Sequence, residues 1–186
     1  NGPVAHEIGG AFVVVALIGH NRLESTQREF YCQMTTTIVT TTERPDLAQT
    51  TGTWRWEAFF RDRSLSEVLD LENECASNPD LMPTVLVLLN RQHPIGMVTL
   101  CLDDLDDRPE LNPWLAGLYV DPAYRGNGHG HRLIKELEAF ASNMGIKRLS
   151  LYTLSAVDLY ASVGWSAIET FERKGKTFSI MQKRIV

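Results

Sequence analysis

Residues 114–131 read WLAGLYVDPAYRGNGHGH and are the most informative segment of the sequence. It begins with a near-continuous apolar run, Trp114 to Val120, which is typical of a β-strand covered on both faces. Glycines then alternate at positions 126, 128 and 130, where the chain turns into a helix. Because glycine has no Cβ atom, several backbone N–H groups of such a turn can point toward one ligand. This order of elements predicts a phosphate-binding site at the start of the helix.

Two common phosphate-binding motifs do not fit these glycines. A P-loop requires Gly-Lys-Ser/Thr, which is missing here. The dinucleotide pattern G-x-G-x-x-G fails because His131 or Leu133 stands where its third glycine would be. What remains is Arg-x-x-Gly-x-Gly, with Arg125, Gly128 and Gly130. A tight turn without a ligand needs only one or two glycines, so it explains this pattern less well.

The elements next to the glycine turn form a βαβ unit. The helix after the turn is expected to end near Gly145, and its predicted buried stripe consists of Leu133, Ile134, Leu137, Phe140, Ala141 and Met144. A strand over Lys147–Thr153 and a short helix over Ala156–Val163 follow. Strand, helix and strand in this order are typical of a parallel pair inside a sheet.

Further strands and two helices surround this unit. The remaining predicted strands are Thr35–Thr42, Thr84–Leu89, Ile95–Leu102, Trp165–Phe171 and Thr177–Ile185. One helix is predicted over Glu43–Arg61 with apolar positions Leu47, Trp54, Ala58 and Phe59, and is weakened by Gly52. A second is predicted over Ser64–Ala76 with Leu65, Val68, Leu69 and Leu71 on its buried side. The predicted fold class is therefore α/β, with a mixed sheet (α+β) flanked by helices.

Two motifs together resemble one family. The Arg-x-x-Gly-x-Gly turn resembles the acyl-CoA pyrophosphate loop of the GCN5-related N-acetyltransferase (GNAT) superfamily. The run LYASVGW at residues 159–165 resembles that family's Leu-Tyr-x-x-x-Gly-Phe/Trp signature, and it follows about thirty residues later in the expected order. The resemblance covers roughly residues 35–186. It implies the acyl-CoA N-acyltransferase fold, in which a mixed, mostly antiparallel sheet has central parallel strands that splay apart.

The resemblance also implies the binding site of acetyl-CoA. The pyrophosphate would be held by Arg125, Gly126, Asn127, Gly128, His129, Gly130 and His131. Backbone groups of Leu118, Tyr119 and Val120 would contact the pantetheine arm and the thioester carbonyl. Tyr160 is the predicted catalytic residue, which would stabilise or protonate the leaving thiolate. The alternative for Tyr160 is a role in core packing.

The sequence does not identify the group that accepts the proton of the amine. Histone-acetylating relatives use a glutamate on the strand before the glycine turn, but Trp114 stands near that place here. A water relay or a carboxylate of the loop before this strand is a substitute, the candidates being Asp103, Asp104, Asp106, Asp107 and Glu110. An acidic loop that merely faces water explains the same charges.

The expected function is transfer of an acetyl group from acetyl-CoA to a primary amine of a small molecule or peptide, by direct attack in a ternary complex. No cysteine lies in the matched motifs, and Cys101 on a buried strand has no evident partner base. Two alternatives remain. One is a catalytically silent CoA-binding regulatory module, and the other is a protein-interaction domain that uses the fold only as a scaffold.

Composition restricts the partners. The 186 residues carry a net charge of -5 with a pI near 5.5, which argues against nucleic acid. The apolar run over residues 11–18 is too short to span a bilayer, so no membrane partner is expected. Three widely spaced cysteines form neither a disulfide framework nor a metal motif, and no metal is expected. A cytoplasmic location follows from these features, and homodimers are common in the family.

The chain is predicted to contain one domain over residues 34–186. Residues 1–33 are interpreted as an N-terminal extension, either an appended segment or an extra strand. A signal peptide explains them less well, because His6 and Glu7 stand where Lys or Arg is expected and no clean cleavage site follows.

Overall fold

The computed structural model describes residues 36–78, 80 and 82–185. The predicted extension over residues 1–33 and the domain boundary at residue 34 lie outside the described residues. The strands are β1 (Thr36–Thr40), β2 (Thr84–Asn90), β3 (His93–Cys101), β4 (Trp114–Val120), β5 (Arg148–Thr153), β6 (Ser166–Arg173) and β7 (Lys176–Arg184). The α-helices are α2 (Ala48–Phe59), α3 (Leu65–Ser77), α4 (His129–Asn143) and α5 (Val157–Ala161), with short 3₁₀ turns at Pro45–Leu47, Pro109–Leu111 and Pro122–Tyr124.

The strands form one seven-stranded sheet in the order β1-β2-β3-β4-β5-β7-β6. All neighbours are antiparallel except β4 and β5, which are parallel and are joined through α4. This is the mixed, mostly antiparallel sheet that the sequence predicts. No α-helix within the described ranges is long and apolar enough to cross a membrane.

The two central strands separate soon after they meet. β4 and β5 share a single register pair, Trp114 with Ser150, next to a hydrogen bond from the Ser150 N–H to the Pro113 carbonyl (3.1 Å). Beyond this pair, β4 continues against β3 and β5 continues against β7. We call the region in which β4 and β5 diverge after this pair the fork. The splayed central strands are thus confirmed.

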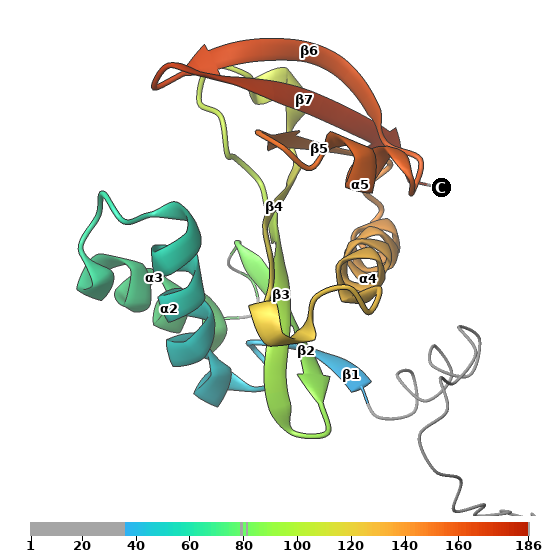
Figure 1. Cartoon of the computed structure of the whole chain (residues 1–186). Coiled ribbons are helices and arrows are strands. Elements are labelled where there is room, and N and C mark those ends of the chain that lie inside the picture. The colour runs from blue at the N-terminus through green and yellow to red at the C-terminus, as the bar shows by residue number, and fades with distance from the viewer. Residues whose placement is uncertain (1–35, 79, 81, 186) are drawn as a thin grey trace, which may run out of the picture.

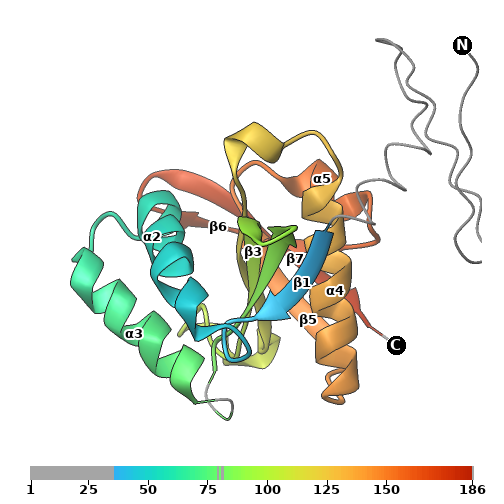
Figure 2. The ribbon, with the colours of Figure 1, turned by 90° about the horizontal axis from the view of Figure 1, so that it is seen from below.

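The sheet lies between two helical layers. Figure 2 shows α2 and α3 on one face and α4 on the other, and Figure 1 shows α5 on the α4 side. The α4 face holds the largest core cluster, in which Leu133, Ile134 and Leu137 of α4 are fully buried. Their spacing confirms most of the stripe predicted for this helix.

Four predicted core positions are wrong. Phe59 is 47% exposed, Leu71 is 44% exposed and Met144 is 52% exposed, and Ala58 is exposed as well. α2 begins only at Ala48, after the 3₁₀ turn at Pro45–Leu47, so its buried side differs from the one expected.

Close packing of α2 on α3 also changes the interpretation of Gly52. A Cβ atom at Gly52 would lie 2.7 Å from Leu69 Cδ2, so the glycine permits close contact of the two helices instead of weakening α2. The residues that α2 buries are Ala48, Thr51, Gly52 and Arg55, which are small or polar. A hydrophobic pattern could not have found them.

Candidate active site

The fork exposes part of a central strand. Trp114 and Leu115 are fully buried, whereas each residue from Ala116 to Val120 is half-buried. Backbone groups of β4 that point away from β3 have no β5 partner along this stretch, because the two strands share only the pair at Trp114. The backbone of Leu118, Tyr119 and Val120 can therefore bind a ligand that enters the fork.

A β-bulge shapes this part of β4. Tyr119 pairs with Met97 and Ala116 pairs with Thr99, so β4 uses one residue more than β3 over the same length. Gly117 lies inside the bulge with φ +56, a value that favours glycine. A bulge increases the local twist of its strand, which accounts for the turn of β4 away from β5.

The glycine turn joins β4 to α4 with the predicted open backbone. Gly126 and Gly128 both have φ +77, and a Cβ atom at either position would meet nothing within 4 Å. The Arg132 N–H is bonded to the Gly128 carbonyl (3.1 Å), which leaves the N–H groups of Gly130 and His131 without an intrahelical partner. Donors at the positive end of a helix of this length favour an anion.

Two polar side chains stabilise the shape of this turn. Arg125 Nε donates to the Val120 carbonyl (2.8 Å), and Asn127 Nδ2 donates to the carbonyls of Tyr124 (3.1 Å) and Arg125 (3.2 Å). The Arg125 Nη groups have no hydrogen-bond partner among the described residues, so they remain available for a phosphate. The sequence placed both side chains on the ligand but did not predict their bonds to the loop.

The two histidines of the motif diverge. His129 is buried at the start of α4, and burial together with Arg132 lowers its pKa. His131 Nε2 lies 3.0 Å from Ser162 Oγ. Because the Ser162 hydroxyl donates its proton to the Leu159 carbonyl (2.6 Å), His131 is the donor in this contact. His131 therefore connects α4 to the segment after α5.

Tyr160 lies on α5, in the core cluster on the α4 face. The cluster also contains Leu115 of β4 and Leu151 of β5, which flank the fork, and the half-buried Leu118 packs against it. The Tyr160 ring packs edge-on against Trp165, with ring centroids 6.0 Å apart. The structure therefore brings Tyr160 to the side of the fork where the glycine turn lies.

The Tyr160 hydroxyl is the part of this side chain that remains accessible. The residue is only 6% exposed, and its hydroxyl has no hydrogen-bond partner among the described residues. Yet no fully buried side-chain polar atom of the described chain lacks a partner. The hydroxyl must therefore be in contact with solvent or a ligand. Burial of the ring raises its pKa to about 12, so it is a proton donor at neutral pH.

The opposite face of the fork carries a buried polar network that the sequence reasoning missed. Arg55 of α2 forms an ion pair with Glu72 of α3 through Nε, and its Nη2 donates to Thr99 Oγ1 on β3 (2.8 Å). Glu72 also accepts from Thr51 Oγ1 (2.9 Å). The spacing of residues in α3 could have indicated that Glu72 is buried, because it falls between Val68 and Cys75 on the buried side of the helix.

The acidic loop before β4 consists mostly of exposed carboxylates. Four of its acids are exposed, namely Asp103, Asp106, Asp107 and Glu110. Asp104 differs, because it is half-buried and has no hydrogen bond or ion pair within the described chain. Burial raises the pKa of Asp104 to about 6, and Arg55 and Arg173 oppose this shift. Of the five candidate bases, Asp104 alone is half-buried.

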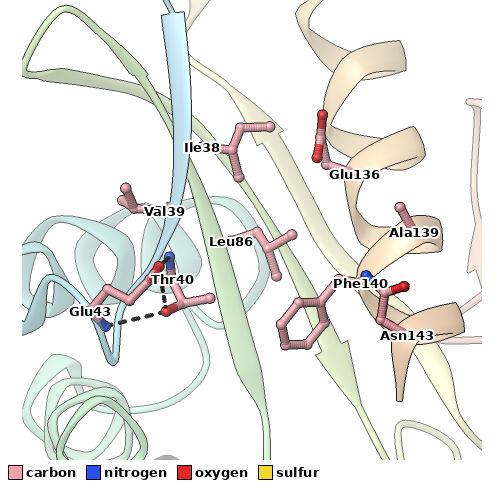
Figure 3. A pocket seen from close by; sticks show the side chains of 9 residues that line it. All are labelled: Ile38, Val39, Thr40, Glu43, Leu86, Glu136, Ala139, Phe140 and Asn143. Carbon is pink, nitrogen blue, oxygen red and sulfur yellow. Dashed lines mark hydrogen bonds between the residues drawn. The ribbon is translucent and has the colours of Figure 1, made fainter. Parts of the chain in front are cut away.

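The hollow in Figure 3 lies elsewhere. It occupies about 250 Å³ between β1, β2 and the C-terminal half of α4, and its lining includes Ile38, Leu86 and Phe140. Its Glu43 carboxylate accepts from the Thr40 N–H (2.8 Å) and belongs to the local turn. None of the predicted site residues contributes to this hollow.

Comparison with known proteins agrees with the fold and with the motifs. The model of the acetyltransferase (GNAT) family matches residues 48–165. An acetyltransferase of the GNAT family from Streptococcus pneumoniae is 21% identical, with TM-score 0.60 over 81% of this chain and 100% of that chain. No curated protein gives a significant match.

Two further structures contain the expected cosubstrate or its product. An aminoglycoside 6'-N-acetyltransferase complexed with coenzyme A is 16% identical, with TM-score 0.61 over 76% of this chain and 92% of that chain. YncA from Salmonella typhimurium, solved with its cofactor acetyl-CoA, is 16% identical, with TM-score 0.64 over 82% and 95%. At such identities the likeness establishes the fold, while the family match covers well over half of the chain. This chain belongs to the acetyltransferase (GNAT) family.

Proposed function

We propose that this protein is an N-acetyltransferase that transfers the acetyl group of acetyl-CoA to a primary amine of a small molecule or peptide. The observation that carries the proposal is the open glycine turn at the start of α4, beside the fork. Space above Gly126 and Gly128 lets a phosphate approach the backbone closely. The residues present therefore fit the diphosphate of CoA.

The binding roles follow from the directions of the backbone groups. The turn from Arg125 to His131 would hold the diphosphate with its N–H groups, aided by the Arg125 guanidinium. Leu118, Tyr119 and Val120 would bind the pantetheine arm with the groups that do not pair with β3. An N–H aimed at the thioester carbonyl would stabilise the oxyanion that forms when an amine attacks.

Tyr160 is the proposed donor to the leaving thiolate. Its pKa of about 12 lies above a thiol's ordinary value of about 8.5, so full proton transfer to the thiolate is uphill. A hydrogen bond from the hydroxyl stabilises the developing thiolate without that transfer. The accessible hydroxyl on an otherwise buried ring supports this role over core packing alone.

Direct attack in a ternary complex is the proposed mechanism. Burial raises the pKa of Cys101 to about 12, so its thiol stays protonated and is a poor nucleophile. Initial rates measured against both substrates should therefore give intersecting double-reciprocal lines. Parallel lines, which indicate a covalent acetyl-enzyme, would contradict this mechanism.

Release of free CoA from acetyl-CoA, measured with a panel of amines and with mass spectrometry of the acetylated product, tests the proposed activity. A silent CoA-binding module would bind CoA in calorimetry but release none from acetyl-CoA. An interaction scaffold would bind neither. The cytoplasmic location and a homodimer stay predictions.

A further inference from the structure

Arg55 and Asp104 carry opposite charges and lie near each other on the α2–α3 face of the fork, but they form no ion pair with each other. Arg55 reaches the bulge of β4, where its Nη1 lies 3.3 Å from the place that a Cβ atom would occupy if Gly117 had one. Asp104 interacts electrostatically with Arg55, but no N–O distance of 4.0 Å or less joins them in the described chain. Two groups of opposite charge that are not paired with each other complement a small ligand that carries both charges.

Arg55 keeps one donor open to such a ligand. The residue is 7% exposed, and its Nε and Nη2 are bonded to Glu72 and Thr99. Its Nη1 has no hydrogen-bond partner among the described residues. Every fully buried side-chain polar atom of the described residues has a hydrogen-bond partner. Nη1 must therefore be the accessible atom of a buried guanidinium. A desolvated cation in this position binds an oxygen atom strongly.

Charged and titratable groups from several elements surround Asp104. They are Arg55 of α2, Cys101 at the end of β3, Asp103 of the same loop, Tyr152 of β5 and Arg173 of β6. Tyr152 lies two residues past the last β4–β5 pair, so Asp104 is close to the β5 side of the fork.

Resting on the function proposed above, we infer that the acceptor is an α-amino group beside its own carbonyl oxygen, as in a free amino acid or a peptide N-terminus. The ammonium binds Asp104 and gives up one proton to its carboxylate. Arg55 Nη1 donates a hydrogen bond to the carbonyl or carboxylate oxygen of the acceptor. An amine nitrogen and a carbonyl oxygen three bonds apart match two such groups of opposite charge.

The chemical step then balances with the groups present. The freed electron pair of the amine nitrogen forms a bond to the acetyl carbonyl carbon, and the C–S bond breaks. The second amine proton passes to the thiolate with the Tyr160 hydroxyl beside it, and Asp104 releases its proton to water. The products are the N-acetylated acceptor, CoA and one proton.

The wild-type protein tests the substrate class directly. Common amino acids, short peptides with the same first residues, and the amines left when the carboxyl group is removed are compared as acceptors. We expect kcat/KM at least about tenfold higher for an amino acid or peptide than for the matching amine. Activity with peptides alone identifies a peptide N-terminus as the acceptor, and activity with amino acids alone identifies a free amino acid. Equal kcat/KM for the matching amine would overturn the inference, whereas no turnover with any amine would overturn the proposed function itself.

The pH dependence of kcat/KM tests the role of Asp104. In the wild type it should fall below about pH 6, because Asp104 then binds a proton and no longer accepts one. Asp104→Asn should lower kcat/KM by about 100-fold and remove this fall. Asp106→Asn, at an exposed position of the same loop, is the matched control and should leave both unchanged. An unchanged profile in Asp104→Asn would remove Asp104 from the reaction.

Arg55→Lys tests the second contact by a ratio that does not depend on the fraction of folded protein. The kcat/KM ratio between an amino acid or peptide and its matching amine is measured with one preparation. We expect this ratio to fall toward one, mainly through a higher KM for the acceptor that carries the carbonyl. A ratio equal to that of the wild type would exclude Arg55 from binding. If the variant does not fold, the wild-type series alone decides.

Discussion

The two faces of the sheet are built from different chemistry. On the α4 face, the fork is flanked by apolar side chains, by the accessible Tyr160 hydroxyl and by the open glycine turn. On the α2–α3 face, the fork meets a buried ion pair between Arg55 and Glu72 and a half-buried carboxylate at Asp104. One face is suited to a long ligand bound by backbone groups, and the other to a small polar acceptor.

The two halves of the proposed site therefore differ in how the sequence encodes them. Backbone N–H groups recognise a diphosphate whatever the surrounding side chains are, so a short motif describes that half of the site. The other half depends on individual charged residues that come from separate elements. Substitutions on the two faces can test this contrast.

Removal of one ion-paired glutamate on each face compares the two networks in stability. Glu72→Ala leaves the buried Arg55 without its counter-charge and should lower the free energy of unfolding by about 3–5 kcal/mol. Glu138→Ala breaks a more exposed pair with Lys183, which also donates to the Val163 carbonyl (2.7 Å), and should cost about 1–2 kcal/mol. Urea denaturation measures both. Equal losses would show that the two faces do not differ in this respect.

Substitution of two glycines separates binding from backbone strain on the α4 face. Gly128 has φ +77 and Gly145 has φ +81, and a Cβ atom at either position meets nothing within 4 Å. Leucine therefore imposes a similar strain at both. Gly128→Leu should weaken CoA binding by about 100-fold, because the side chain occupies the space above the N–H groups. Gly145→Leu should leave the affinity unchanged, and calorimetry with CoA would contradict the loop assignment if the two variants bound alike.

Tyr160→Phe removes the proposed donor while it keeps the ring. The contact with Trp165 remains, so the fold and the affinity for acetyl-CoA should be retained. We expect kcat to fall by about 10-fold to 100-fold, since stabilisation of the thiolate is lost. Steady-state kinetics measure kcat, and calorimetry with CoA serves as the control. An unchanged kcat would assign Tyr160 to core packing.

Asp104→Asn should stabilise the protein at neutral pH even though it impairs the reaction. The pKa of Asp104 is raised to about 6 in the folded state, so the folded state binds this proton more tightly than the unfolded state does. The stability from this group is present below about pH 4 and is lost as the pH rises through about 6. We expect Asp104→Asn to raise the free energy of unfolding at pH 7 by about 1–2 kcal/mol. A fully buried carboxyl would give a larger gain, but that of Asp104 is partly hydrated. Urea denaturation at pH 4 and pH 7 checks this, and the gain should vanish at the lower pH.

The α4 face could be predicted from the sequence almost residue by residue. Trp114–Val120 is the strand that the apolar run predicts, and Leu133, Ile134 and Leu137 lie in the core as their spacing requires. The α2–α3 face could not be predicted in this way. Phe59 was expected in the core and is exposed, while Arg55, one helical turn earlier, is buried. Its burial depends on Glu72, which lies in another helix.

The family, the βαβ unit and the position of the glycine turn could be predicted from the amino-acid sequence alone. These rest on local order, because a strand, a turn with positive φ and an amphipathic helix are encoded by neighbouring residues. Only the tertiary structure decided which of five acids is desolvated, that a bulge at Gly117 turns β4 away from β5, and that Arg55 keeps one donor open. Burial and charge coupling depend on distances between residues far apart in the chain, and no local pattern contains those distances.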